Sequence, residues 1–111
     1  MKIVAKPWGS ERWLFVNKQY AAKIITVNKG HKFSLQYHRR KHESWYFYKG
    51  EAKVTLGKKV IIAKSGRIID VKPKAVHRVE GITKAQFFEV STPELKDVVR
   101  LEDDYGRSTI K

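Results

Sequence analysis

Turn-forming residues recur at short intervals along this chain, and their spacing limits the possible folds more than any other feature of the sequence. Glycine or proline beside a polar residue marks turns at 28–30, 49–50, 57–59, 65–66, 72–73 and 80–81. The segments between these turns are short and rich in β-branched and aromatic residues, which is typical of strands: 22–27, 33–38, 44–48, 53–56, 60–63, 67–71, 76–80 and 85–90. Many short strands separated by turns predict an all-β sandwich or barrel.

The end of the chain departs from this pattern. Thr92 precedes Pro93 and Glu94, which is the order of a helix N-cap followed by proline and an acidic residue in the first turn, so we expect one helical turn at 92–97. A polar tail is expected at 100–111. Because the sequence shows no repeat, low-complexity tract or linker, residues 1–111 are predicted to form a single domain.

Composition excludes several classes of protein. With 41% hydrophobic residues, the chain carries enough apolar side chains for a core, which excludes general disorder. The absence of cysteine excludes disulfide scaffolds and thiolate zinc sites, so a metal would need histidine, carboxylate or amide ligands. Apolar stretches are too short for a membrane span or a signal peptide, and we therefore expect a cytoplasmic protein without a membrane partner.

A large excess of basic residues predicts an anionic partner. The 24 Lys and Arg outnumber the 11 Asp and Glu, giving a formal net charge of +13, which suits a nucleic acid, an acidic surface or a phosphorylated small molecule. Basic residues are spread over most predicted strands, with one dense run at 38–42, and this distribution argues against nucleic acid. Frequent Lys and Arg with a single Met are also typical of a protein from a thermophile.

Several residues that can bind a metal are expected on the same strand faces. Side chains alternate along a strand, so Gln36 and His38 point the same way, and Glu43 shares a face with Trp45 on what we take to be the adjacent strand. His77 lies on a later strand. Taken singly, each has an ordinary structural role as an alternative: a hydrogen-bonded histidine, an amide that satisfies backbone groups, or a carboxylate paired with a lysine.

The spacing of these residues resembles a known pattern. Gly30, Gln36, His38, Glu43 and Gly50 follow the first motif of the cupins, with Gln36 where many cupins have a histidine, and the stretch 66–77 resembles the second motif. The resemblance implies a cupin double-stranded β-helix, a jelly-roll-like barrel that holds a metal in its mouth.

A closer resemblance covers nearly the whole chain. Five ordered blocks are similar to the type II mannose-6-phosphate isomerase module, which also forms the C-terminal domain of mannose-1-phosphate guanylyltransferases: 6–10, 34–38, 43–45, 77–80 and 99–107. The sequence departs from the family in the basic residues at 39–41, in Ser44 and in the position of Pro73, which lies one place closer to His77 than is usual. These departures leave the four metal-binding positions intact.

The resemblance implies a metal-dependent enzyme. Gln36, His38, Glu43 and His77 would hold a divalent ion, with zinc as the first choice and manganese, iron, cobalt or nickel as alternatives. The reaction implied is the interconversion of mannose 6-phosphate and fructose 6-phosphate through an enediol. Two other activities stay open, a non-catalytic cupin that binds a sugar phosphate or nucleotide sugar and another metal-dependent cupin enzyme such as a different sugar-phosphate isomerase.

Catalysis would need a base near neutrality and a cationic anchor for the phosphate. Lys41, with a pKa lowered by burial beside the metal, and His42 are the candidates for the base. Arg40, Lys41, Arg78 and Arg107 are the candidates for the phosphate anchor, because phosphate suits cationic donors and above all guanidinium groups. We also expect a homodimer, since a chain this short gains buried surface by pairing.

Overall fold

Strands make up nearly all of the regular structure. The computed structural model describes residues 2–94 and 96–107. Within these residues it contains eleven strands and no helix long and apolar enough to cross a membrane. The strands are β1 (Lys2–Lys6), β2 (Gly9–Val16), β3 (Ala21–Val27), β4 (Leu35–Tyr37), β5 (Glu43–Lys49), β6 (Ala52–Leu56), β7 (Lys59–Ala63), β8 (Ile68–Val71), β9 (His77–Gly81), β10 (Ala85–Ser91) and β11 (Val99–Glu102).

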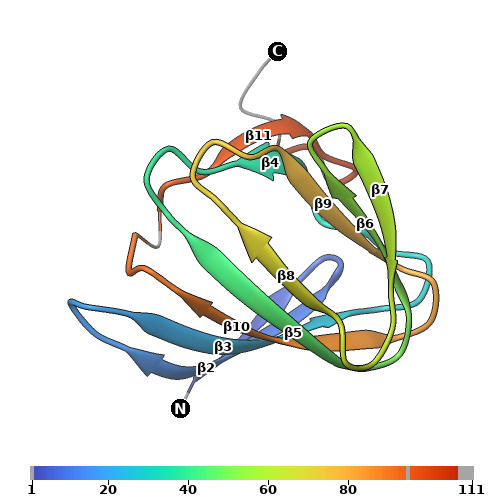
Figure 1. Cartoon of the computed structure of the whole chain (residues 1–111), viewed down its shortest axis with the longest axis horizontal. Helices are drawn as coiled ribbons and strands as arrows, with labels where there is room; N and C mark the ends of the chain where they lie inside the picture. Colours follow the sequence, from blue (N-terminus) through green and yellow to red (C-terminus); the bar gives the residue numbers. More distant parts are fainter. Residues whose placement is uncertain (1, 95, 108–111) are drawn as a thin grey trace.

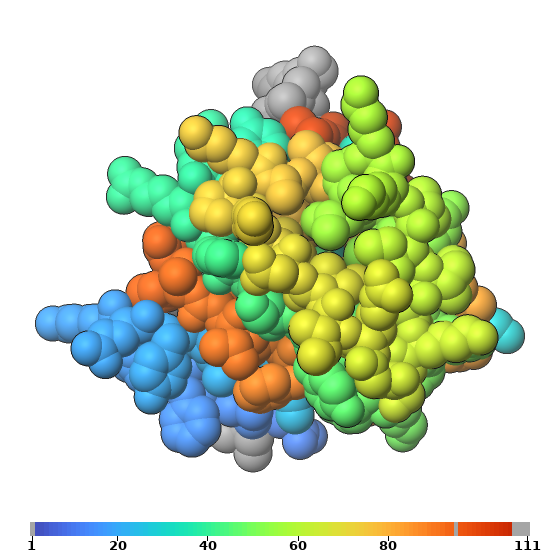
Figure 2. Space-filling view, in the orientation of Figure 1, coloured from blue at the N-terminus to red at the C-terminus, as the bar shows by residue number. Residues whose placement is uncertain are grey.

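Two antiparallel sheets face each other across the interior. Sheet A has the order β1-β2-β3-β10-β5-β8, and sheet B has the order β11-β4-β9-β6-β7. Neighbouring strands are often far apart in sequence, as where β10 lies between β3 and β5. Figure 1 shows β2, β3 and β10 on one side of the interior and β4, β9 and β11 on the other. From the same direction, Figure 2 shows side chains closing the space that the ribbon leaves between the sheets.

The core is aromatic and follows from strict alternation. Trp45 and Phe47 on β5 point inward and are buried, while Tyr46 and Tyr48, which alternate with them, point outward. The rings of Trp45 and Phe47 lie 4.8 and 4.7 Å from the ring of Phe87 on β10, the neighbouring strand. These tilted ring contacts fill the floor of the barrel and leave its mouth to polar residues.

The predicted all-β fold is confirmed, and the differences lie at the two ends of the chain. The eight predicted segments overlap strands β3 to β10, whereas β1, β2 and β11 were not predicted. The polar tail expected from residue 100 begins instead within β11, which pairs with β4. The helical turn expected at 92–97 is not formed by its described residues, because they cross between the sheets in an irregular connection. Residue 95 lies outside the described residues.

Candidate metal centre

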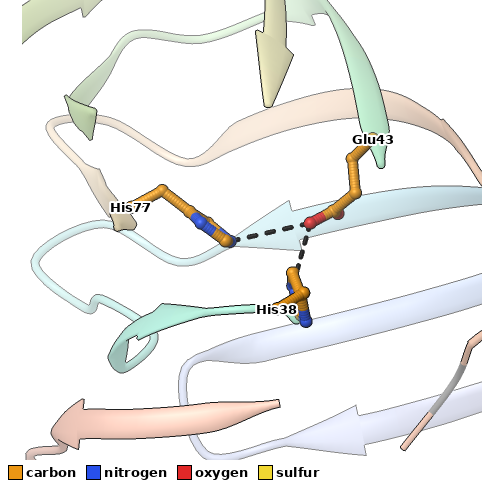
Figure 3. Close-up of side chains that lie close together, drawn as sticks. All are labelled: His38, Glu43 and His77. Carbon is orange, nitrogen blue, oxygen red and sulfur yellow. Dashed lines mark ion pairs between the residues drawn. The ribbon is translucent and has the colours of Figure 1, made fainter. Parts of the chain in front are cut away.

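Three buried side chains converge at the mouth of the barrel (Figure 3). His38 follows β4, while Glu43 and His77 are the first residues of β5 and β9. Oε2 of Glu43 lies 2.9 Å from Nε2 of His38 and 3.6 Å from Nε2 of His77. The potential ligand atoms of all three residues lie within 4.8 Å of one another, which is close enough to bind one metal ion.

The two sheets supply different ligands. Gln36 on β4 is paired with His77 on β9 in sheet B, so these residues and His38 come from one sheet. Glu43 belongs to sheet A and reaches the same point from across the barrel. The expectation that Glu43 lies on the strand adjacent to His38 is wrong, because the turn after β4 carries the chain from one sheet to the other. Glu43 meets the two histidines because the two sheets face each other across the barrel.

Hydrogen bonds hold both imidazoles with Nε2 directed at the carboxylate. Nδ1 of His38 lies 2.5 Å from the backbone carbonyl of Asp97, and Nδ1 of His77 lies 2.9 Å from that of Ala75. A carbonyl only accepts, so each Nδ1 carries a proton, and Nε2 is the nitrogen of each ring that would bind a metal ion. Oε2 of Glu43 is buried, and no described donor makes a well-directed hydrogen bond to it. Two nitrogen lone pairs and a carboxylate oxygen facing one another fit a divalent cation.

Gln36 lies beside these three residues but turns its amide oxygen away from them. Oε1 of Gln36 accepts a hydrogen bond of 2.5 Å from the hydroxyl of Ser34, and its Nε2 lies 3.5 Å from Nε2 of His77. A half-turn of the amide would direct the oxygen to the same point, since the two ends of an amide have nearly the same shape. Gln36 as a ligand therefore stays a prediction.

Burial and local charges favour an ionised carboxylate at Glu43 and a neutral imidazole at His77. Burial acts to raise the pKa of Glu43, but its contact with His38 and the charge of Lys41 hold that pKa well below the ordinary value. Burial lowers the pKa of His77, against the opposing effect of Glu43. A charged carboxylate and a neutral imidazole are the forms that bind metal ions.

Lys41 and Glu89 form a second buried pair next to the candidate ligands. Nζ of Lys41 lies 3.4 Å from Glu89 and 3.9 Å from Glu43. We expected a lowered pKa for Lys41, and this is wrong: burial acts in that direction, but the two carboxylates raise the pKa above its ordinary value. Burial and the charge of Glu43 raise the pKa of Glu89 to about 8. Lys41 is thus a stable cation, and Glu89 is the group that titrates near neutrality.

The other predicted site residues occupy different places. The side chain of His42 is half exposed and bonds to the Asp70 carboxylate at 2.9 Å, outside the cavity. Arg40 is exposed. Arg78 follows His77 and so points to the opposite face of β9, where its Nε donates to the carbonyl of Phe33. Arg107 is paired with Asp103 and does line the cavity.

A cavity of about 240 Å³ opens above the three candidate ligands. Aromatic walls are formed by Trp8, Trp13 and Phe33, and Trp8 is also a buried core residue. Six cationic side chains and three carboxylates line it: Lys6, Lys23, Lys41, Lys96, Arg100, Arg107, Glu11, Glu43 and Glu89. The lining therefore carries an excess of positive charge, which favours an anionic ligand.

Sequence reasoning missed three charged residues that line the cavity, Glu11, Lys23 and Glu89. A signal for two of them exists in the sequence, since Lys23 alternates with Ala21 and Ile25, and Glu89 alternates with Phe87 and Ser91. A charged residue at the inward position of an apolar strand is costly unless it is paired. Such a residue therefore indicates a polar site inside the barrel.

Known proteins are similar to this chain in sequence. The family model for the mannose-6-phosphate isomerase C-terminal domain matches residues 1–103. Mannose-1-phosphate guanylyltransferase ManC from Salmonella typhimurium is 35% identical over 94% of this chain and 23% of its own length. The alginate biosynthesis protein AlgA from Pseudomonas aeruginosa is 32% identical over 95% of this chain and 23% of its own length. The chain thus spans about a quarter of the length of these relatives.

Solved structures match over most of the chain. KdgF from Halomonas sp. superposes with a TM-score of 0.78 at 13% identity, covering 87% of this chain and 90% of its own. An RmlC-like cupin from Shewanella frigidimarina has a TM-score of 0.77 at 21% identity and covers 86% of both chains. The family model covers nearly all of the sequence, and the solved structures have the same architecture as this chain. The chain therefore belongs to the mannose-6-phosphate isomerase C-terminal family and has the cupin fold.

Proposed function

We propose that this chain is a metal-dependent aldose-ketose isomerase that interconverts mannose 6-phosphate and fructose 6-phosphate. The observation that carries this proposal is the convergence of His38, Glu43 and His77 at one end of a cavity whose lining has an excess of positive charge. A metal centre beside a cationic cavity suits a substrate with both a sugar carbonyl and a phosphate. Membership of the family supports the same substrate.

His38, Glu43 and His77 would hold the metal, with Gln36 as a fourth ligand after rotation of its amide. Two nitrogen donors and one carboxylate favour zinc, with manganese, iron, cobalt and nickel as alternatives. The bound ion would act as a Lewis acid that polarises a carbonyl or hydroxyl oxygen of the sugar. The protein contributes fixed ligands, because the Nδ1 hydrogen bonds hold both imidazole rings in place.

Glu89 replaces His42 as the candidate for proton transfer. It lines the cavity, and a pKa of about 8 lets its carboxyl both hold and release a proton near neutral pH. We propose that the ionised carboxylate of Glu89 takes a proton from C2 of the aldose and returns it to C1 of the enediol, while a proton passes between the sugar oxygens O2 and O1. Lys41 stays protonated beside it, and its ammonium stabilises negative charge on the sugar oxygen.

The phosphate anchor is proposed at the end of the cavity formed by the last strand. Arg107 and Arg100 line that part together with Lys96, and guanidinium groups bind phosphate with two parallel hydrogen bonds. Arg40 and Arg78 are left out of this anchor, since Arg40 is exposed and Arg78 bonds to Phe33 on the far face of β9.

A coupled assay tests the isomerase. Metal-free protein is reloaded with each divalent ion and given mannose 6-phosphate, glucose 6-phosphate or fructose 6-phosphate. We expect turnover of the mannose and fructose esters with zinc or a related ion, and none above background without metal. Binding of the sugar phosphate without turnover would contradict the enzyme and favour the non-catalytic cupin. Turnover of the glucose ester alone would indicate a different isomerase.

Variants locate the activity. Glu43→Gln removes the anionic ligand, and we expect metal affinity to fall by roughly 100-fold or more, together with turnover. Glu51→Gln makes the same chemical change at a surface carboxylate paired with Lys64, and it should leave both unchanged. If Glu43→Gln retains the metal and the activity of the parent protein, the proposed centre is wrong.

We also propose a homodimer through the outer face of sheet A. Ile24, Phe88, Tyr46 and Ile68 are opposite one another on four successive strands, and Ile68 is 70% exposed. An uncharged row is unusual on a chain of net charge +13, and it is where two copies would repel each other least. Sedimentation equilibrium should give a dimer mass, and Tyr46→Lys should give a monomer. A monomeric parent protein would contradict the proposal.

A further inference from the structure

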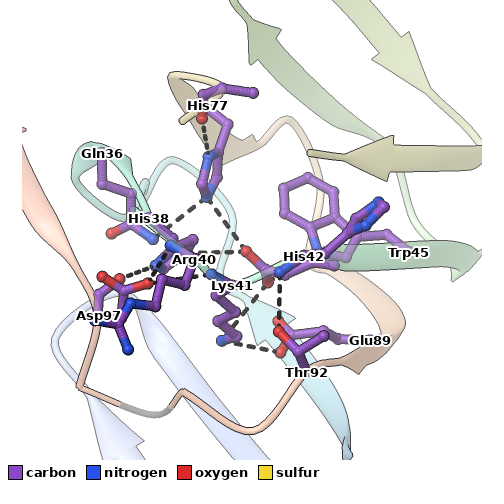
Figure 4. A network of polar contacts seen from close by, with 12 residues as sticks. Gln36, His38, Arg40, Lys41, His42, Trp45, His77, Glu89, Thr92 and Asp97 are labelled. Carbon is purple, nitrogen blue, oxygen red and sulfur yellow. Dashed lines mark hydrogen bonds and ion pairs between the residues drawn. The ribbon is translucent and has the colours of Figure 1, made fainter. Parts of the chain in front are cut away.

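One residue outside the candidate ligand set makes four contacts with the segment that carries His38. The backbone carbonyl of Asp97 lies 2.5 Å from Nδ1 of His38. The carboxylate of Asp97 accepts hydrogen bonds from three successive backbone N–H groups, those of Arg39 at 3.1 Å, Arg40 at 2.6 Å and Lys41 at 3.1 Å. Figure 4 shows Asp97 beside this turn, with His38 and Arg40 next to it.

The same connection is tied to the turn at a second point. Thr92 donates its backbone N–H to the carbonyl of His42, and its hydroxyl accepts the N–H of His42, both at 3.0 Å. Asp97 and Thr92 therefore hold the turn 39–42 at its beginning and at its end, respectively. These two segments are about fifty residues apart in the sequence, and the turn between them leads from His38 in sheet B to Glu43 in sheet A.

His77 is held by another turn. Its Nδ1 bonds to the carbonyl of Ala75, and the N–H of Lys74 in that turn donates to the carbonyl of His38 at 2.6 Å. This arrangement fixes the backbone of His38 but leaves the rotation of its imidazole ring undetermined. The direction of the ring depends on the acceptor at Nδ1, which belongs to Asp97.

A carboxylate is the side chain that can make these bonds. Three neighbouring N–H groups need an acceptor with several lone pairs and no hydrogen of its own, and an ionised aspartate provides two such oxygens. An asparagine would keep one oxygen but present an NH₂ group to the remaining donors. Holding the turn through the carboxylate also places the backbone carbonyl of the same residue at the imidazole.

We propose that Asp97 is a positioning residue that selects the Nδ1–H tautomer of His38 and directs its Nε2 at the site of the metal. It acts through His38 and the turn 39–41 and does not touch the reacting atoms. Its effect on metal affinity rests on the proposed function, whereas its effect on the tautomer does not. Partners of this kind, which orient a metal ligand, contribute roughly 10- to 100-fold to affinity.

Two measurements on Asp97→Ala, Asp97→Asn and Asp70→Ala test the proposal. Asp70→Ala is the matched control, because the Asp70 carboxylate bonds to the side chains of His42 and Ser44 next to the same turn but to neither imidazole of the candidate site. Nitrogen-15 NMR of metal-free protein, at a pH high enough for both imidazoles of the site to be neutral, reports the tautomer of His38. Competition with a chromophoric chelator reports the affinity for zinc.

We expect the parent protein and Asp70→Ala to show a single Nδ1–H tautomer of His38 and zinc affinities equal within about threefold. Asp97→Ala should show a mixture of tautomers and roughly 10- to 100-fold weaker binding, with Asp97→Asn between the two. If Asp97→Ala fails to fold, Asp97→Asn carries the test.

Two outcomes separate the inference from the proposed function. A single Nδ1–H tautomer and unchanged zinc affinity in the Asp97 variants would overturn the role of Asp97. Absence of zinc binding by the parent protein would instead contradict the proposed metal centre. The tautomer measurement would still decide the role of Asp97 in that case.

Discussion

Burial changes the acidity of the Glu89 side chain. Burial and the nearby charge of Glu43 raise its pKa to about 8 in the folded protein, from 4.5 in an exposed carboxyl group. Between these two pH values the folded state binds a proton that the unfolded state lacks. The stability contributed by this group is therefore fully present below about pH 4.5 and is lost as the pH rises through 8.

Replacing this residue makes the effect measurable. The amide in Glu89→Gln carries no charge at any pH, so we expect the melting temperature of this variant relative to the parent protein to increase from pH 5 to pH 8. The difference between the two proteins is the quantity to measure by calorimetry, without metal, because the lowered pKa of His77 acts in the opposite direction in both. A difference that stays constant with pH would contradict a raised pKa, and Glu51→Gln serves as the control.

Alternation explains which single residues could be predicted. It placed Gln36 and His38 on one strand face and Glu43 on the same face as Trp45, and the motif resemblance then added His77. The same rule excludes Arg78 from the cavity, because it follows an inward-facing residue on the same strand. Alternation could not predict the partner of Lys41, since Glu89 lies far along the sequence and meets it only after two sheets form.

At the scale of the elements, strands with clear turns at both ends could be predicted and the outer ones could not. Residues 2–6 and 9–16 pair with each other across a tight turn at Pro7 and Trp8. This turn was not recognised from the sequence, and the two strands beside it were therefore not predicted. β11 is rich in charged residues and forms because β4 offers it backbone partners. Its existence depends on tertiary pairing, which the local sequence does not encode.

Gly50 joins β5 to β6 and shows how closely the connections pack. A Cβ atom at this position would lie 2.1 Å from the backbone oxygen of Lys84, and the φ of +75° is unfavourable for other residues. We expect Gly50→Ala to lower the free energy of unfolding by about 3 to 5 kcal/mol, since a backbone contact must move. Urea denaturation measures this change.

Gly57 provides the matched control for that element. Its φ of +60° is similar, but apart from its two chain neighbours no heavy atom of the described residues lies within 4 Å of the position of a Cβ. Gly57→Ala should therefore show the conformational cost alone, roughly 1 to 2 kcal/mol. If both variants lose the same free energy of unfolding, steric contact at Gly50 contributes nothing.

For the whole molecule, the charge of +13 has two consequences. Inside, part of it lines the cavity and favours an anionic substrate. Outside, the chain has more than twice as many cationic as acidic residues, so many lysines are left near other cations. Two explanations of this excess predict opposite effects of the charges on stability. The charges either form a network of stabilising ion pairs, as in thermophile proteins, or repel one another at a cost in stability that is offset by attraction of the ligand.

Salt distinguishes these explanations, because it screens attraction and repulsion alike. Few carboxylates are available to pair with the lysines and arginines, so we expect repulsion to dominate and the melting temperature to rise by several degrees between roughly 10 mM and 300 mM NaCl. Lys58→Glu in the exposed turn between β6 and β7, combined with Lys59→Glu at the exposed first residue of β7, lowers the net charge to +9 and should reduce this rise. A melting temperature that falls with salt would instead support ion-pair networks and the predicted thermophile origin. A melting temperature in the mesophilic range would contradict that origin.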